Sequence, residues 1–189
     1  MHASRVTLAV ALASLPAGLW AQQISTSPIK RLAPFVASPQ NVVEKMLEAA
    51  DVKPNENVYD LGSGDGRVLI TAAQRFGAKA VGIEISAKEV KSSTERIKQL
   101  KLDDRIQVVE GDLLTADLSK ADVVTIYLLT TSNEQIRPKL EKSLHAGARV
   151  VSHDYQIPGW TPKKVEKVEA HKRTHQLYVY EMPPQKQQQ

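Results

Sequence analysis

The residues best suited to bind a ligand form a glycine-rich segment that follows an apolar run, DLGSGDGR at residues 60–67. Glycine adopts positive φ angles without strain and lets a ligand approach the main chain closely. In open α/β sheets, ligands bind at the carboxyl ends of the strands, where such a turn would lie. The spacing differs from the dinucleotide fingerprint, whose third glycine would fall at Arg67, and no Gly-Lys-Ser/Thr phosphate loop follows.

Four acidic residues accompany this turn and restrict the choice of ligand. They are Asp60 and Asp65 in the turn, Glu84 at the end of the next strand, and Asp112 at the end of the third. An acid placed like Glu84, about twenty residues downstream, accepts hydrogen bonds from ribose hydroxyls. Such a rim repels a pyrophosphate and favours a positively charged ribose ligand, a description that S-adenosylmethionine fits. The alternative is that the glycines only form a tight turn and that Glu84 is an acid at a helix N-terminus.

Apolar periodicity predicts alternating strands and helices around this segment. The expected strands span residues 57–61, 78–85, 106–109, 121–129 and 148–151, and the expected helices span residues 39–50, 67–76, 86–102 and 133–144. Ser38 is expected to cap the first helix, and Ser86 with Glu89 to form a capping box at the third. Residues 165–170 and 176–180 surround a short polar turn and predict a hairpin.

This alternation predicts an α/β fold with a doubly wound, Rossmann-like sheet of seven strands, mostly parallel with a C-terminal antiparallel hairpin. The link between the third and fourth strands, about ten residues, is short for a crossover that contains a full helix.

The composition is that of one soluble globular domain: 189 residues, 42% hydrophobic and 24% charged. The chain has no cysteine, which excludes disulfides and thiolate metal sites. No group of histidine and acidic residues shows metal-ligand spacing, so no metal site is expected. The net charge of +4 falls to +3 without the first 22 residues, which is too little for a strong nucleic-acid footprint.

The segment VYDLGSGDGR, with GIEIS downstream, resembles the cofactor-binding half of class I S-adenosylmethionine-dependent methyltransferases. Over residues 35–180 the chain looks closest to the lysine N-methyltransferases related to the mitochondrial enzyme for the ATP synthase c subunit, and more distantly to the Dot1 type. The segments PFVAS at residues 34–38 and VVS at residues 150–152, followed by YQIPGWTP at residues 155–162, carry the closer similarity.

The resemblance implies which residues bind S-adenosylmethionine. The glycine turn would line the methionine end, the acid after the second strand would hold the ribose, and the end of the third strand would lie beside the adenine. The segment before the first helix would close over the cofactor. The implied cofactor-binding residues are Phe35, Val36, Asp60, Gly62, Ser63, Gly64, Asp65, Gly66, Glu84, Ile85, Asp112 and Leu113.

Methyl transfer depends mainly on alignment of the reacting atoms, and an amine acceptor must also lose its proton. Tyr127, at the end of the fourth strand, and Asp154 and Tyr155, after the fifth strand, are the candidate catalytic residues. The alternative for the adjacent pair His153 and Asp154 is a hydrogen-bonded loop. Enzymes that methylate amino groups of nucleic acids usually carry an Asn/Asp-Pro-Pro-aromatic motif, where this chain reads YLLT at residues 127–130. DNA is therefore not an expected acceptor.

The predicted function is that of a monomeric protein-lysine N-methyltransferase, with membrane-protein lysines among the expected substrates. A small-molecule methyltransferase and a non-catalytic S-adenosylmethionine-binding protein are the alternatives. The second alternative follows from an N-terminus that looks like an export signal, because the cofactor is made in the cytoplasm.

Residues 1–22 have the layout of a secretory signal, with one arginine, no acid, and an apolar stretch from Val6 to Leu15 that is too short to span a bilayer. A cleavage site at Ala21 prefers a small residue at position 19, where this chain has Leu19. An uncleaved membrane tether is therefore the alternative. The expected organisation is this segment, a linker at residues 23–34, the methyltransferase domain at 35–182 and a disordered tail at 183–189. The expected location is periplasmic or membrane-tethered, with the cytoplasm as the alternative.

Overall fold

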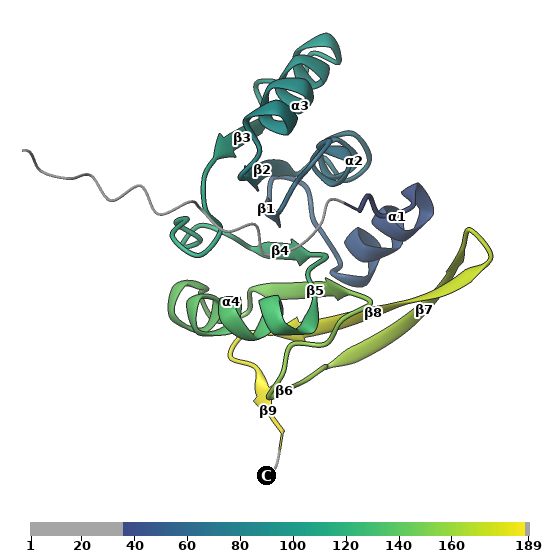
Figure 1. Ribbon diagram of the computed structural model, residues 1–189, viewed down its shortest axis with the longest axis vertical. Coiled ribbons are helices and arrows are strands. Elements are labelled where there is room, and N and C mark those ends of the chain that lie inside the picture. Colours follow the sequence, from purple (N-terminus) through teal and green to yellow (C-terminus); the bar gives the residue numbers. More distant parts are fainter. Residues whose placement is uncertain (1–35, 188–189) are drawn as a thin grey trace, which may run out of the picture.

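The computed structural model describes residues 36–187, and its main feature is a seven-stranded sheet with the strand order β3-β2-β1-β4-β5-β8-β7 (Figure 1). Neighbouring strands among β1 to β5 are parallel, whereas β8 is antiparallel to both β5 and β7. This arrangement confirms the expected fold class. The helices are α1 (Gln40–Ala49), α2 (Arg67–Phe76), α3 (Ala87–Gln99) and α4 (Thr130–Ser143). The strands are β1 (Asn57–Leu61), β2 (Lys79–Glu84), β3 (Ile106–Glu110), β4 (Val123–Ile126), β5 (Arg149–His153), β6 (Trp160–Thr161), β7 (Lys164–Ala170), β8 (Arg173–Glu181) and β9 (Gln185–Lys186).

The sheet separates two apolar clusters, one on each face. One cluster joins α1, α2 and α3 to inward-facing residues that include Val123 and Val151. The other joins α4 to Val124 and Val150, the sequence neighbours of those two residues. Because successive side chains of a strand point to opposite faces, β4 and β5 are covered on both sides, as their unbroken apolar sequences predict.

The fourth strand is shorter than expected and the helix after it is longer. β4 ends at Ile126, and α4 begins at Thr130 with Leu129 as its N-cap residue. The apolar run extends to Leu129, but Leu128 is buried beyond the end of the strand and Leu129 is 41% exposed. Hydrophobic periodicity alone cannot distinguish these residues from a continued strand. Residues 111–122, between β3 and β4, contain turns but no helix, as their length suggested.

Two expected helix caps differ in outcome. Ser86 caps α3, since its hydroxyl accepts a hydrogen bond from the main-chain nitrogen of Glu89 at 3.4 Å. Ser38 does not cap α1, where Pro39 occupies the N-cap position without a side-chain hydrogen bond. The hydroxyl of Ser38 instead lies 2.8 Å from Nδ1 of His153, so a tertiary contact replaces the local one.

The C-terminal segment is ordered where disorder was expected. β9 pairs antiparallel with β6, Gln187 donates a main-chain hydrogen bond to Gly159, and Lys186 forms an ion pair with Glu141. The expectation of a disordered tail is therefore wrong for residues 183–187, because these tertiary partners are not visible in the local composition. Residues 188–189 lie outside the described part of the chain.

The N-terminal expectations fall outside the described residues. These are the secretory or membrane-directing segment, the linker and the cofactor contact of Phe35. Within residues 36–187, no helix combines the length and the apolar character needed to cross a bilayer.

Candidate active site

The glycine-rich segment forms the turn between β1 and α2, and its glycines have the conformations that require this residue type. Gly62, Gly64 and Gly66 have φ angles of 88°, 49° and 75°, in the left-handed region that side chains disfavour. The main-chain nitrogens of Gly62 and Ser63 donate to the oxygen of Ile83 at 2.8 and 3.2 Å. The turn is thereby held against the end of β2, at the carboxyl edge of the sheet.

A cavity opens at this edge, between the turn, the ends of β2, β3 and β4, and the segment that leads into α1. Most of the expected cofactor-binding residues line it, and Tyr127 does so as well. Gly66 is not among the lining residues, but it is the N-cap residue of α2. The expected residues that line the cavity are Val36, Asp60, Gly62, Ser63, Gly64, Asp65, Glu84, Ile85, Asp112, Leu113 and Tyr127.

Asp60 is a buried carboxyl at the base of this cavity. Burial raises its pKa to about 7, although a hydrogen bond of 2.7 Å from the Thr125 hydroxyl acts in the opposite direction. The negative charge of Glu84 raises the pKa further. A cation placed beside Asp60 would favour its ionised form, so this wall of the cavity is suited to a positively charged ligand.

Glu84 is fixed by the main chain on both of its oxygens. Oε2 accepts a hydrogen bond from the nitrogen of Gly64 at 2.9 Å, and Oε1 accepts one from the nitrogen of Ser86 at 2.8 Å. A carboxylate has about four acceptor sites, so each oxygen keeps one for a ligand. Glu84 therefore joins the glycine turn to the start of α3 and still offers acceptors of the kind that ribose hydroxyls need.

Asp112 is positioned by its own loop, at the end of β3. Its Oδ1 accepts a hydrogen bond of 2.8 Å from the nitrogen of Leu114, and its main-chain oxygen accepts from Thr115 and Ala116. The turn places Asp112 and Leu113 in the cavity wall, opposite the glycine turn.

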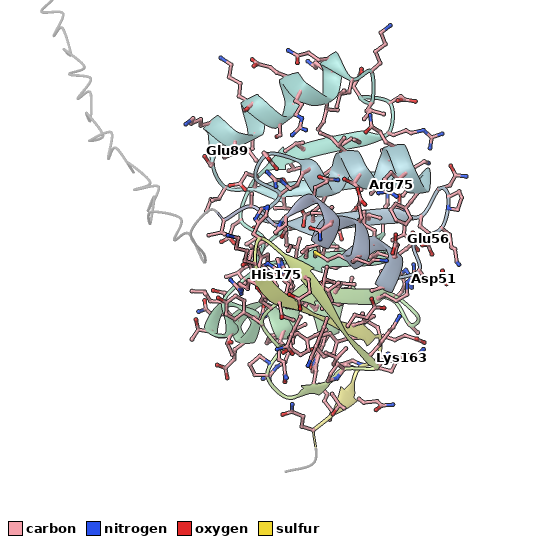
Figure 2. The ribbon with its side chains drawn as sticks, turned by 90° about the vertical axis from the view of Figure 1, so that its right-hand side faces the viewer. Asp51, Glu56, Arg75, Glu89, Lys163 and His175 are labelled. Carbon is pink, nitrogen blue, oxygen red and sulfur yellow. The ribbon has the colours of Figure 1, made fainter. Side chains whose placement is uncertain are left out.

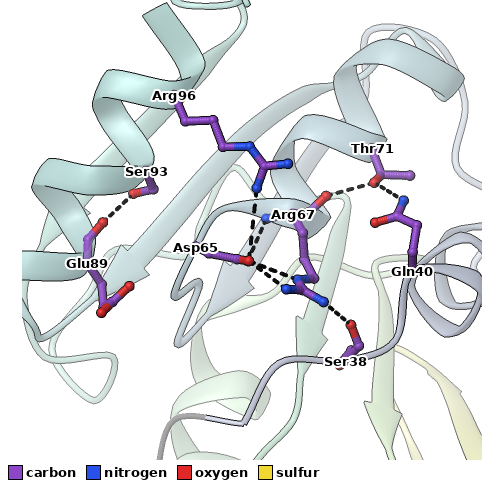
Figure 3. A network of polar contacts seen from close by, with 8 residues as sticks. All are labelled: Ser38, Gln40, Asp65, Arg67, Thr71, Glu89, Ser93 and Arg96. Carbon is purple, nitrogen blue, oxygen red and sulfur yellow. Dashed lines mark hydrogen bonds and ion pairs between the residues drawn. The ribbon is translucent and has the colours of Figure 1, made fainter. Parts of the chain in front are cut away.

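Asp65 differs from the other acids because its charge is compensated within the protein (Figure 3). Arg67 donates from Nε to Oδ1 at 3.0 Å and from Nη2 to Oδ2 at 2.6 Å, and Arg96 lies 3.9 Å away. Although burial acts to raise the pKa of Asp65, these hydrogen bonds from Arg67 hold it below its usual range. Asp65 lines the cavity as the other three acids do, but its charge is paired with Arg67.

Arg67 also contacts the segment that enters α1, and sequence reasoning missed it. Its Nη1 donates a hydrogen bond of 2.7 Å to the main-chain oxygen of Ser38 (Figure 3). The segment at residues 36–38, which lines the cavity, is thus fastened to the glycine turn. The Asp-Gly-Arg sequence was visible, but nothing in it indicates that the arginine folds back onto a residue so distant in the chain.

The cavity also contains a buried hydroxyl with an open hydrogen-bonding position. Oγ of Ser63 is buried and has no hydrogen-bond partner among the described residues. A Cβ on Gly82 would lie 2.5 Å from this oxygen, so β2 leaves room for Ser63 only because position 82 is glycine. The carboxyls of Asp60, Glu84 and Asp112 line the cavity and offer hydrogen-bond acceptors and negative charge, which fit the ribose and the positive charge of S-adenosylmethionine.

Of the three candidate catalytic residues, one lines the cavity and two lie outside its lining. Tyr127 lines the cavity, and its ring stacks on that of His153 with a centroid distance of 3.9 Å. Asp154 and Tyr155 do not line it. The Tyr127 hydroxyl lies 3.4 Å from Oδ2 of Asp154, and burial, followed by the charge of Asp154, raises the pKa of Tyr127. Tyr127 is therefore a neutral hydroxyl at neutral pH, backed by a carboxylate.

Tyr155 is placed to support this wall. Its ring centroid lies 6.1 Å from that of Tyr127, with the rings nearly stacked. Its main-chain oxygen accepts hydrogen bonds from Ser152 Oγ at 2.5 Å and from Asn133 Nδ2 at 3.0 Å. Asn133 is fully buried at the start of α4, so the loop after β5 is fixed to that helix.

Asp154 is the centre of a polar cluster that spacing rules did not reveal. Its Oδ1 accepts a hydrogen bond from the nitrogen of Gln176 at 2.9 Å, and its Oδ2 lies 3.1 Å from Nδ1 of His175. Oδ2 also accepts a bond of 2.5 Å from Arg173. His153 is fully buried in this cluster, and burial lowers its pKa to about 4. His175 is distant in sequence and comes close to His153 only because β8 pairs with β5.

The chain is similar in sequence to known methyltransferases. Residues 60–164 match the family model described as the ANTKMT methyltransferase domain. A protein-lysine N-methyltransferase of Saccharolobus islandicus is 47% identical over 148 residues, which cover 78% of this chain and 92% of that relative. An ATP synthase c-subunit lysine N-methyltransferase of Homo sapiens is 31% identical over 132 residues. These residues make up 70% of this chain and 56% of that protein.

A solved structure is also similar in both sequence and fold. It is described as an RNA methyltransferase from Salinibacter ruber in complex with S-adenosyl-L-homocysteine. The TM-score is 0.75 and the identity is 42%, with 78% of this chain and 94% of that chain covered.

Proposed function

The chain belongs to the family of the ANTKMT methyltransferase domain, and from this premise we propose that it methylates the side-chain amine of lysine in a protein. The chain is an S-adenosylmethionine-dependent methyltransferase. The main support for a lysine acceptor is the 47% identity to a protein-lysine N-methyltransferase. The alignment covers 92% of that relative.

We propose that the cofactor lies along the acidic edge of the sheet. Asp60 would face its positive end, Glu84 would accept hydrogen bonds from the ribose, and Asp112 with Leu113 would border the adenine. When bound, S-adenosylmethionine supplies a methyl group that a positive sulfur activates for in-line transfer to a nucleophile. The support is that the site is preformed, since main-chain donors hold both oxygens of Glu84 in place without a ligand.

The acceptor amine must be positioned and must be uncharged when it reacts. Tyr127 is the residue of the cavity wall that suits this task, because its hydroxyl proton faces Asp154 and its oxygen lone pairs remain available for an amine N–H. Asp154 has partners on both oxygens and acts through Tyr127 as a positioning residue. Tyr155 supports the Tyr127 ring from the side.

The rim of the cavity favours a large acceptor with apolar surface. Val36 lines the cavity and is 58% exposed, and Leu129, next to the lining residue Leu128, is 41% exposed. These are two of the four large hydrophobic side chains that are exposed in the described part of the chain. A protein docked at the cavity entrance would cover them, whereas a small molecule inside the cavity would not.

RNA is the second candidate acceptor, because the solved structure with 42% identity is described as an RNA methyltransferase. An experiment that offers the enzyme RNA and protein together distinguishes these two acceptors. Purified protein is incubated with radiolabelled cofactor and an extract that contains membranes, and the products are then divided between protease and ribonuclease digestion. The Asp60→Asn variant, weakened at the cofactor site, is the matched control.

The expected result is label in protein bands that resists ribonuclease, is lost to protease, and appears as methyl-lysine after hydrolysis. Label that ribonuclease removes would establish RNA as the acceptor, and label confined to small molecules would establish the small-molecule alternative. Either of these outcomes would overturn the proposed lysine specificity.

We also propose that residues 1–22 direct this domain to the periplasm or tether it to a membrane, beside membrane-protein substrates. The support is the apolar segment that follows a single arginine. Mass spectrometry of the mature N-terminus, combined with cell fractionation, tests this. An intact N-terminus on protein that stays in the soluble cytoplasmic fraction would contradict it.

A further inference from the structure

Three metal-ligating side chains converge behind the Tyr127 wall of the cavity. His153 ends β5 and Asp154 follows it. His175, labelled in Figure 2, lies on β8, which forms the C-terminal hairpin with β7 (Figure 1). Nε2 of His153 lies 2.8 Å from Nδ1 of His175 and 3.4 Å from Oδ2 of Asp154, and the remaining distance, from His175 Nδ1 to this oxygen, is 3.1 Å. The three atoms form a small triangle with sides of 2.8, 3.1 and 3.4 Å.

Protons alone cannot satisfy all three sides of this triangle. A carboxylate only accepts hydrogen bonds, and a neutral imidazole donates from one nitrogen and accepts at the other. If only one of the two facing ring nitrogens carries a proton, the other nitrogen presents a lone pair to the carboxylate. If both carry protons, two N–H groups oppose each other across the 2.8 Å separation of His153 and His175. Each arrangement leaves one side of the triangle repulsive.

A divalent cation removes this conflict, because it attracts all three lone pairs at once. We propose that His153, Asp154 and His175 form a metal site for an ion of the zinc class. Two imidazoles and one carboxylate are a ligand set that Zn²⁺ accepts. Bond lengths of about 2.0–2.1 Å in a tetrahedron place the ligand atoms roughly 3.3 Å apart, close to the separations in this cluster. The fourth position is left for water.

The surroundings of the three ligands match those of metal sites. Ligating histidines usually use their second nitrogen to bind an outer partner, and ligating carboxylates are themselves hydrogen-bonded. Nδ1 of His153 lies 2.8 Å from the Ser38 hydroxyl, and the free oxygen of Asp154 accepts a bond of 2.9 Å from the nitrogen of Gln176. Asp154 also has a φ angle of 61°, an uncommon conformation that directs its carboxylate to the two histidines.

One cation of the protein already contacts this site and must yield to the metal. Nη2 of Arg173 lies 2.5 Å from the same oxygen of Asp154 that would bind the ion. The Arg173 side chain is 57% exposed, so it can move into solvent without leaving a buried charge unpaired. Arg173 is therefore a competitor of the metal, and its removal strengthens binding.

The metal would join three separate parts of the chain. β5 supplies His153, β8 supplies His175, and the Ser38 contact connects the ion to the segment that enters α1. The Tyr127 ring stacks on the His153 ring, so the ion also fixes one wall of the cavity. This inference does not depend on the acceptor of the methyl group.

The test is a titration of the chelator-treated full chain with Zn²⁺ and, as a spectroscopic probe, Co²⁺. Calorimetry should find one site whose affinity falls at least about tenfold in His175→Gln and rises about tenfold in Arg173→Gln. Zn²⁺ should raise the melting temperature of the wild-type chain, and Co²⁺ should give the visible absorption of a tetrahedral complex. His171→Ala, which removes an exposed histidine of the same hairpin, should bind like the wild type.

The Arg173 variant keeps the inference falsifiable if the His175 variant fails to fold. Affinity that is unchanged or weaker in Arg173→Gln would mean that the guanidinium does not compete for the site. Equal losses in the His171 and His175 variants would mean that the loss is not specific to the proposed ligands. Either result, or the absence of a wild-type site, would overturn the proposal.

Discussion

Arg67 binds the main chain of Ser38 through a hydrogen bond of 2.7 Å while its other guanidinium nitrogens bind Asp65 (Figure 3). The two ends of this contact belong to different parts of the cavity, the entrance segment before α1 and the glycine turn. The planar guanidinium makes both sets of bonds at once, which an ammonium group does not. Arg67 therefore links the position of the entrance segment to the shape of the turn.

Arg67→Lys should weaken cofactor binding about tenfold while preserving the charge, because lysine cannot hold both partners in the same geometry. The dissociation constant for S-adenosyl-L-homocysteine, measured by calorimetry, checks this. Arg75→Lys is the matched control, since Arg75 lies on the same helix and pairs with Glu44 at the surface. A loss of equal size in both variants would indicate a general effect on α2.

Asp60 should make the stability of the ligand-free protein depend on pH. Its pKa is about 7 in the folded chain against 3.8 as the ordinary value, so the folded state binds more protons between these pH values. The free energy of unfolding should therefore fall as pH rises through this window, by up to about 1.4 kcal/mol per pH unit. Asp60→Asn should remove this contribution, and chemical denaturation at several pH values measures it.

The same carboxyl should make cofactor affinity depend on pH in the opposite direction. The positive charge of S-adenosylmethionine favours ionised Asp60, so affinity should increase between about pH 6 and about pH 8 in the wild type. The Asp60→Asn chain should bind more weakly and show little pH dependence. Asp103→Asn, at an exposed position, is the control. A pH dependence that survives in Asp60→Asn would have to come from another group.

The fold and the glycine turn could be predicted because both depend on local sequence. Alternating apolar patterns identified the strands and helices of the sheet, and the spacing of Gly62, Gly64 and Gly66 identified the turn. The end of β4 could not be placed, because Leu128 is apolar for a tertiary reason, its burial beyond the strand.

Individual polar contacts, both local and between distant segments, are the part that could not be predicted. Asp65 looked like a member of the acidic rim, but Arg67 neutralises it within the same loop. His175 follows His153 by 22 residues, with β6 and β7 between them, and only the pairing of β8 with β5 brings the two rings together. Contacts of this kind depend on strand order and register, which periodicity does not specify.

Gly82→Ala should destabilise the protein by about 1–3 kcal/mol, because β2 has no space for a methyl group at this point. The added Cβ would lie 2.5 Å from Ser63 Oγ and 2.7 Å from Leu69 Cδ1. Gly111→Ala is the control, since a Cβ there meets no heavy atom within 4 Å. Urea denaturation of both variants measures the difference, and equal stability of the two would contradict the proposed crowding.

Tyr127→Phe should reduce kcat about 10-fold to 100-fold and leave the dissociation constant of S-adenosyl-L-homocysteine nearly unchanged. The ring that stacks on His153 is retained, so the loss is confined to the hydroxyl that faces Asp154. Because the pKa of Tyr127 is raised, the wild-type hydroxyl stays protonated at neutral pH and its lone pairs can accept from the acceptor amine. The rate of single-turnover methyl transfer to the acceptor protein found in the labelling experiment measures the effect. Tyr178→Phe, on β8, is the control. An unchanged rate would exclude the Tyr127 hydroxyl from acceptor positioning.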